Sequence, residues 1–121
     1  MENIPDIKYQ LSSKDLFDAF KIQLRKDFEQ SNFSINFIEA LAPDYGSIHD
    51  KIVFELELHE KNTNFKLMKL LNRIDISETQ LKRYLSENKN ENHFSVIAEL
   101  IIKRVLQKVV IKQFYKNKEN P

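Results

Sequence analysis

The sequence predicts an α+β fold, in which an antiparallel pair of strands packs against helices within a single domain. Three observations support this prediction. Apolar residues recur at helical spacing over 13–30, alternate with polar residues over 33–41 and 52–59, and form a broad helical face over 95–115. The 121 residues are 41% hydrophobic, which suits one core. The expected order is α-β-β-α-α-α.

The composition excludes several classes of protein. The absence of cysteine excludes disulfides, thiolate metal sites and cysteine nucleophiles. The single glycine, Gly46, excludes the Walker P-loop and the dinucleotide-binding loop, because both need several glycines. A net charge of +1 with 31% charged residues fits neither a disordered polyanion nor a histone-like polycation. We expect a protein that is not an enzyme and binds no cofactor.

The first predicted helix runs from about residue 13 to residue 30 and follows an arm formed by residues 1–10. Ser12 and Asp15 have the spacing of a capping box, and Leu11 and Leu16 that of a hydrophobic staple. The apolar positions of this helix recur at helical spacing and indicate a face packed on a core: Leu16, Phe17, Phe20, Leu24 and Phe28.

Two strands are predicted next, joined by a loop over 42–51. The first places Phe33, Ile35 and Phe37 on one face. In the second, which covers 52–59, apolar residues at the even positions alternate with polar or charged residues, apart from Val53. A two-stranded sheet is marginal by itself, so helices or a second subunit should cover it.

The C-terminal half is predicted to be helical. A short helix over 65–74 precedes a second that starts at Glu78, capped by Ser77 with Gln80, and a polar loop covers 86–92. A long helix then covers about 95–115, although its β-branched residues leave a strand over 108–115 as an alternative. Residues 117–121 are expected to be a disordered tail.

The long helix has more apolar surface than one small chain needs to bury, which predicts a contact with a partner. We assign the partner interface to five residues: Ile97, Ile101, Val105, Val110 and Phe114.

Residues 70–85, LLNRIDISETQLKRYL, resemble a bacterial helix-turn-helix motif. The matching anchors are Leu70, Ile74, Ile76, Ser77, Leu81 and Leu85. Leu71 replaces the usual alanine, and Asp75 replaces the turn glycine, which normally has φ > 0. The resemblance implies that DNA would face five residues: Glu78, Thr79, Gln80, Lys82 and Arg83. An ordinary pair of short helices is the alternative interpretation of these 16 residues.

Charge is unevenly distributed along the chain. Residues 1–60 have a net charge of −6 and residues 61–121 a net charge of +7. Four cations recur every four residues on the last helix and repel one another unless an anion is near: Arg104, Lys108, Lys112 and Lys116. The anion could be phosphate, or the protein's own acidic residues Asp15, Asp18, Glu55 and Glu57, within the chain or across a dimer.

Two groups of residues suggest chemistry, and each has a simpler interpretation. Asp44, His49, Asp50 and His59 could hold a metal ion or supply a general base, but polar loops often contain such residues by chance. Glu55 and Glu57 share one face of the predicted strand, like paired acid-base carboxylates or like two exposed glutamates. The serines serve better as helix caps than as nucleophiles.

These patterns together predict a non-catalytic interaction or scaffolding module of a bacterial-type cytoplasmic protein that acts as a homodimer and can bind another protein. DNA binding through 78–85 is the alternative, and a metal-dependent enzyme is the third. No secretory signal is visible at the N-terminus. Charged residues interrupt the most apolar stretch, 94–115, so we expect no membrane span.

Overall fold

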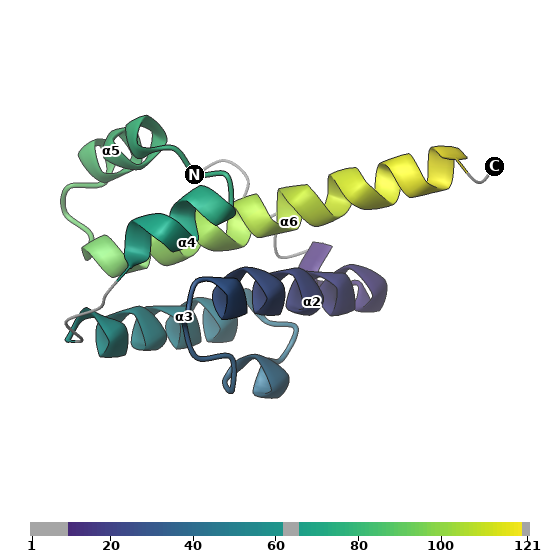
Figure 1. Cartoon of the computed structure of the whole chain (residues 1–121), viewed down its shortest axis with the longest axis horizontal. Helices are drawn as coiled ribbons and strands as arrows, with labels where there is room; N and C mark the ends of the chain where they lie inside the picture. Colours follow the sequence, from purple (N-terminus) through teal and green to yellow (C-terminus); the bar gives the residue numbers. More distant parts are fainter. Residues whose placement is uncertain (1–9, 62–65, 120–121) are drawn as a thin grey trace.

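The computed structural model describes residues 10–61 and 66–119, and all its regular elements are helices (Figure 1). The predicted α+β fold is wrong, because the described residues contain no strand and no sheet. The elements are α2 (Lys14–Gln30), the 3-10 helix η1 (Ile38–Ala40), α3 (Tyr45–Glu60), α4 (Leu67–Arg73), α5 (Glu78–Glu87) and α6 (His93–Glu119).

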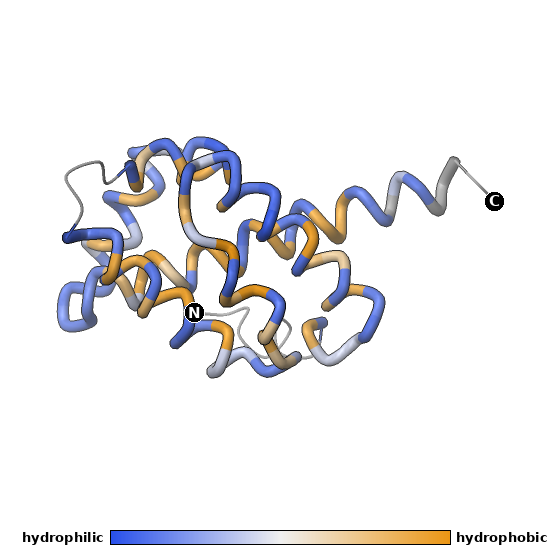
Figure 2. Tube along the Cα trace, turned by 60° about the horizontal axis from the view of Figure 1, so that its bottom comes forward, coloured by the Kyte–Doolittle hydropathy of each residue, from blue (hydrophilic) through white to orange (hydrophobic). Residues whose placement is uncertain are grey.

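The long helix α6 is the centre of the fold. It packs against α2, α3 and α5, and α2 also packs against α4 and η1. Its residues from 96 onward supply much of the core, with these side chains buried: Val96, Ile97, Ala98, Leu100, Ile101, Ile102, Val105, Leu106 and Val109. Figures 1 and 2 show the end of α6 reaching past the other helices.

The first predicted strand, over 33–41, is instead an irregular segment that follows the end of α2 and contains η1. The amide of Phe33 donates to the carbonyl of Phe28 at 3.0 Å, and the amide of Asn32 donates to that of Glu29 at 3.2 Å. Asn32 has φ 64°, so the helix ends in a Schellman motif in which asparagine takes the position usually held by glycine. The rings of Phe28 and Phe33 meet edge to face, 5.5 Å apart. The apolar residues from 33 onward therefore fold back over the end of α2.

The second predicted strand is the second half of α3. Asp44 caps this helix by accepting from the amide of Ser47 at 2.8 Å, within what was predicted to be a loop. Ile52 and Leu56 are buried and continue a helical row from Ile48. The other half of the alternating pattern, Phe54 and Leu58, remains exposed.

The helix caps give mixed results. Ser77 caps α5 and accepts from the amide of Gln80 at 3.0 Å, which confirms the predicted cap. The N-cap of α2 is Ser13 rather than Ser12, and the side chain of Ser13 makes no capping bond.

The long C-terminal helix is confirmed, and the alternative strand over 108–115 is wrong. The helix continues through Glu119, so residues 117–119 of the expected tail are helical, while 120–121 lie outside the described residues. Residues 1–9 of the expected arm also lie outside them. None of the helices in 10–61 and 66–119 has both the length and the apolar content that crossing a bilayer requires.

Candidate functional site

The first half of α6 does not offer the partner surface that the sequence predicted. Ile97, Ile101 and Val105 are buried against other helices of the same chain. Val110 is half-buried, and the side chain of Phe114 lies outside the described residues. Three of the five predicted interface residues are therefore inaccessible, because α2, α3 and α5 cover the helix on several sides.

The basic row of α6 is partly neutralised by α2. Lys108 Nζ lies 3.4 Å from Oδ2 of Asp27, which is buried, and donates to the carbonyl of Arg73 at 3.3 Å. Lys112 Nζ donates to Gln23 Oε1 at 2.6 Å, and Gln23 donates to Asp27 at 3.2 Å. The sequence analysis singled out neither Gln23 nor Asp27. Their i, i+4 spacing on α2, which matches that of the two lysines, was the available signal.

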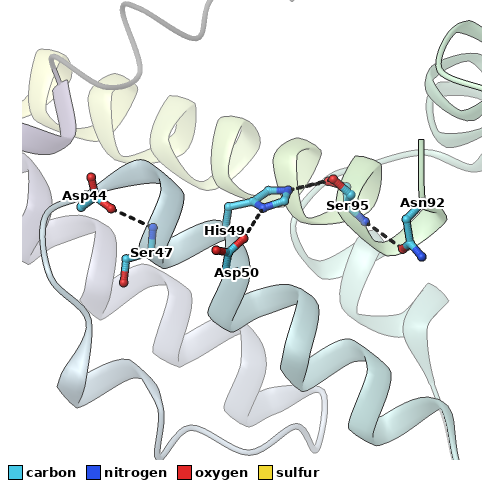
Figure 3. A network of polar contacts seen from close by, with 6 residues as sticks. All are labelled: Asp44, Ser47, His49, Asp50, Asn92 and Ser95. Carbon is cyan, nitrogen blue, oxygen red and sulfur yellow. Dashed lines mark hydrogen bonds and ion pairs between the residues drawn. The ribbon is translucent and has the colours of Figure 1, made fainter. Parts of the chain in front are cut away.

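The predicted metal or general-base group is dispersed along α3 (Figure 3). Asp44 is occupied as the N-cap, and His49 points toward the start of α6. His59, about four turns away from Asp44, contacts Phe33, with ring centroids 4.6 Å apart. No cluster of three side chains able to hold a metal ion occurs in the part of the chain that the structure describes.

His49, Asp50 and Ser95 are connected in the order of a hydrolase triad, but the geometry does not activate the serine. His49 Nε2 lies 2.9 Å from the carbonyl oxygen of Ser95 and 3.2 Å from its Oγ, while Nδ1 lies 3.3 Å from Asp50. A carbonyl oxygen can only accept, so Nε2 carries the proton and cannot receive one from the hydroxyl. The network instead joins α3 to the first turn of α6, where the side chain of Asn92 accepts from the amide of Phe94 at 2.8 Å.

The predicted carboxylate pair is separated by the helix. Glu55 is buried and Glu57 is exposed, because adjacent odd positions of a helix point in different directions. Burial raises the pKa of Glu55, and the neighbouring His59, 3.8 Å away, opposes that rise. The amide of Ser34 donates to His59 Nε2 at 3.4 Å, so that nitrogen accepts a hydrogen bond and ties the segment after α2 to α3.

The segment that resembles a helix-turn-helix forms two helices joined by a tight turn. Asp75 has φ 70°, as the turn position of the motif requires, and the amide of Ile76 donates to the carbonyl of Leu71 at 2.8 Å. This is the same Schellman motif that ends α2, so the turn also occurs in this chain outside the segment that resembles a helix-turn-helix.

The residues assigned to DNA lie mostly at the surface. Thr79, Lys82 and Arg83 are exposed, and Gln80 is half-buried. Glu78, also exposed, lies 3.3 Å from Lys82 and neutralises part of its charge.

Glu99 is a further buried polar group that the sequence analysis did not single out. It lies on the buried half of α6, and its Oε1 atom has no hydrogen-bond partner among the described residues. Burial and the nearby Glu91 raise its pKa, while His49 and Lys103 lower it to a smaller extent. Tyr45 is also affected: its own burial, together with the charges of the nearby Glu99 and Glu91, raises its pKa.

Six large apolar side chains among the described residues are exposed. Ile22 on α2 and Met68 on α4 are two of them, and the other four form two pairs, each spaced four residues apart on one helix. These two pairs are the candidate functional sites. The α3 surface consists of Phe54 and Leu58, which are 60% and 48% exposed. The distal α6 surface consists of Ile111 and Tyr115, which are 52% and 57% exposed. Large apolar side chains grouped in this way on a small protein are typical of contact surfaces.

The α3 surface is shaped by two hollows on either side of Phe54. One, of about 450 Å³, lies between the end of α3 and the start of α6 and is lined by Leu58 and Phe94 as well. The other, of about 340 Å³, is lined by Phe37 and Lys51 among others. The surface is therefore a ridge between depressions, which suits the side chains of a second helix.

Comparison with known proteins yields no matching family model, no matching curated protein and no matching solved structure. The two apolar surfaces and the charges around them are therefore the features of the fold that bear on its function.

Proposed function

We propose that this protein is a non-catalytic interaction module, a cytoplasmic protein of bacterial type, that associates with a second copy of itself. One observation carries the proposal. The helix α6 continues for ten residues after Val109, the last buried residue among those of α6 whose side chains the structure describes, and this extension displays Ile111 and Tyr115 to solvent. A helix end that bound nothing would gain no stability from exposing a bulky aliphatic and an aromatic side chain.

The polar groups of the fold also favour a structural role over catalysis. His49 joins α3 to α6, His59 joins α3 to the segment after α2, and Asp27 with Gln23 holds two lysines of α6. Each of these groups is occupied by a contact between separate parts of the fold.

The solution mass tests the proposal. Light-scattering chromatography at tens of micromolar should give twice the mass of the 14.4 kDa chain. Ile111→Asp should shift the protein toward the monomer, because a charge at the contact must lose its water on association. Met68→Asp, on α4, is the matched control and should leave the mass unchanged. A wild-type protein that stays monomeric would overturn the proposal.

DNA binding is a second candidate, favoured by the positive φ of Asp75 together with the exposed Thr79, Lys82 and Arg83. Fluorescence anisotropy with duplex DNA over a salt series tests it. Binding that weakens steeply with salt and is lost on replacing both Lys82 and Arg83 with alanine would support it. Binding absent at low salt, or unchanged in that variant, would overturn it.

A further inference from the structure

We infer that the distal α6 surface of one copy docks on the α3 surface of a second copy, and that the contact is reciprocal, so that two copies exchange their α6 ends. This inference rests on the proposed self-association and names the two surfaces that meet. Four observations carry it.

The first observation is that a chain cannot cover its own α3 surface with its own distal surface. Phe94, in the first turn of α6, lines the hollow beside Leu58. Ile111 lies 17 positions further along the same uninterrupted helix, a distance of about 25 Å. Figure 1 shows α6 running from the α3 end of the molecule to the opposite side. An α6 end that reaches the α3 surface must therefore come from another copy.

The second observation is the matching shape of the two surfaces. Phe54 and Leu58 are four residues apart on one helix, and Ile111 and Tyr115 are four residues apart on the other. Rows of side chains at this spacing form the ridges and grooves through which helices most often pack. The hollows on both sides of Phe54 offer room for the incoming side chains.

The third observation is complementary charge. The helix α3 carries four acidic residues and only one basic residue, Lys51, and Glu57 and Glu60 line the larger hollow. The last thirteen residues of α6 carry four lysines and one glutamate. Lys61 also lines the larger hollow, so the surroundings of the α3 pair are predominantly, not exclusively, acidic. Those of the distal pair are predominantly basic, and this difference favours contact between the two surfaces over contact of either with itself.

The fourth observation concerns the number of copies that this contact joins. The contact joins two different surfaces, and every copy carries both. Such a contact either repeats along an open filament or closes when the partner returns the same contact. A reciprocal exchange covers both surfaces of every copy with the fewest copies, whereas a filament leaves one apolar pair exposed at each end, so we infer a dimer.

Mixing two disabled variants tests the pairing directly. Ile111→Asp disables the distal surface, and Phe54→Asp with Leu58→Asp disables the α3 surface. Each variant alone should be monomeric, with a dimer Kd raised at least tenfold. Their mixture should form a dimer that neither forms alone, because one intact distal surface then meets one intact α3 surface. Native mass spectrometry identifies this mixed species.

The outcomes separate this inference from the proposed function. A monomeric wild-type protein overturns both. A wild-type dimer overturns the exchange alone if either disabled variant still dimerises by itself, because the contact would then join two like surfaces. A wild-type dimer also overturns the exchange alone if the mixture of the two variants stays monomeric. Wild-type assemblies that grow with concentration beyond twice the chain mass overturn the reciprocal closure.

A charge exchange adds a second readout. Glu57→Lys and Lys116→Glu should each weaken the dimer several-fold, and a chain carrying both should recover the wild-type Kd. Circular dichroism confirms that each variant is folded, and Met68→Asp again serves as the control. A double variant weaker than both single variants would overturn the pairing of these two surfaces.

Discussion

The helix α6 has similar apolar spacing before and after Val109, but the two parts lie in different surroundings. Ile101 and Val105 are inaccessible to solvent, whereas Ile111 and Tyr115 are more than half exposed. The difference arises because α3 and α5 pack near the start of α6, and α2 alone runs beside its later part (Figure 1). The burial of a position on α6 thus depends on which other helices pack against it. The spacing of apolar residues along α6 alone cannot predict it.

The largest expected effect is a contrast in stability between the two parts. Ile101→Ala should reduce the free energy of unfolding by about 2–5 kcal/mol, because it leaves a cavity in a closed core. Ile111→Ala should change it by less than about 0.5 kcal/mol. Urea unfolding at a protein concentration that dissociates the dimer measures both. Equal losses would mean that Ile111 is packed within its own chain.

Asp27 on α2 contacts Lys108 in the buried part of α6, and its replacement tests how much this contact contributes to the free energy of unfolding. Asp27→Ala leaves the ammonium of Lys108 without its carboxylate and should cost about 1–3 kcal/mol of unfolding free energy. Asp18→Ala, at an exposed position of the same helix, should change stability by less than about 0.5 kcal/mol. Chemical denaturation of both variants makes the comparison, and similar values would show that the Asp27 contact contributes nothing of its own.

The helices with a clear amphipathic pattern or a capping signal could be predicted from the sequence. α2, α5 and α6 lie close to their predicted ranges, and Ser77 caps α5 as expected. The strands failed for two local reasons. Asn32 continues the chain through a left-handed turn that is usually marked by glycine, and this chain has only one glycine. Asp44, a strong N-cap residue, lay in the segment predicted to be a loop.

The candidate site could be predicted only in part, because alternation cannot distinguish the two faces of a helix from those of a strand. Ile52 and Leu56 are consistent with either structure, and Phe54 and Leu58 appeared to belong to the same buried face. Which pair is exposed depends on where α3 rests on α6, a long-range contact with no local signal. The wide apolar face of α6 was recognised correctly, but three of its residues were assigned to a partner when α2, α3 and α5 cover them.

The contribution of the buried part of α6 to the stability of the fold should also depend on pH, unlike that of its exposed end. Burial and Glu91 raise the pKa of Glu99 in the folded state, so its charged form destabilises the fold. The cost is absent well below the unfolded pKa and grows as the pH rises through the folded pKa. Glu99→Gln should therefore stabilise the protein at pH 7, and the gain should disappear toward pH 4.

Thermal unfolding of wild type and Glu99→Gln over this pH range measures the effect. Glu29→Gln, at an exposed position on α2, is the control and should give no comparable gain. A gain for Glu99→Gln that stayed constant with pH would show that the charge of Glu99 is not its cause.

The smallest expected effect locates the boundary between the two parts of α6. Lys112 lies one turn before Lys116 and still reaches Gln23 on α2, at 2.6 Å. Lys112→Ala should cost about 0.5–1 kcal/mol of unfolding free energy, because a part-buried hydrogen bond makes only a modest net contribution to stability. Lys26→Ala, at an exposed site on α2, should cost less than about 0.5 kcal/mol. If Lys112→Ala costs no more than this control in urea unfolding, α2 stops stabilising α6 at Val109, and the whole extension is available to a second copy.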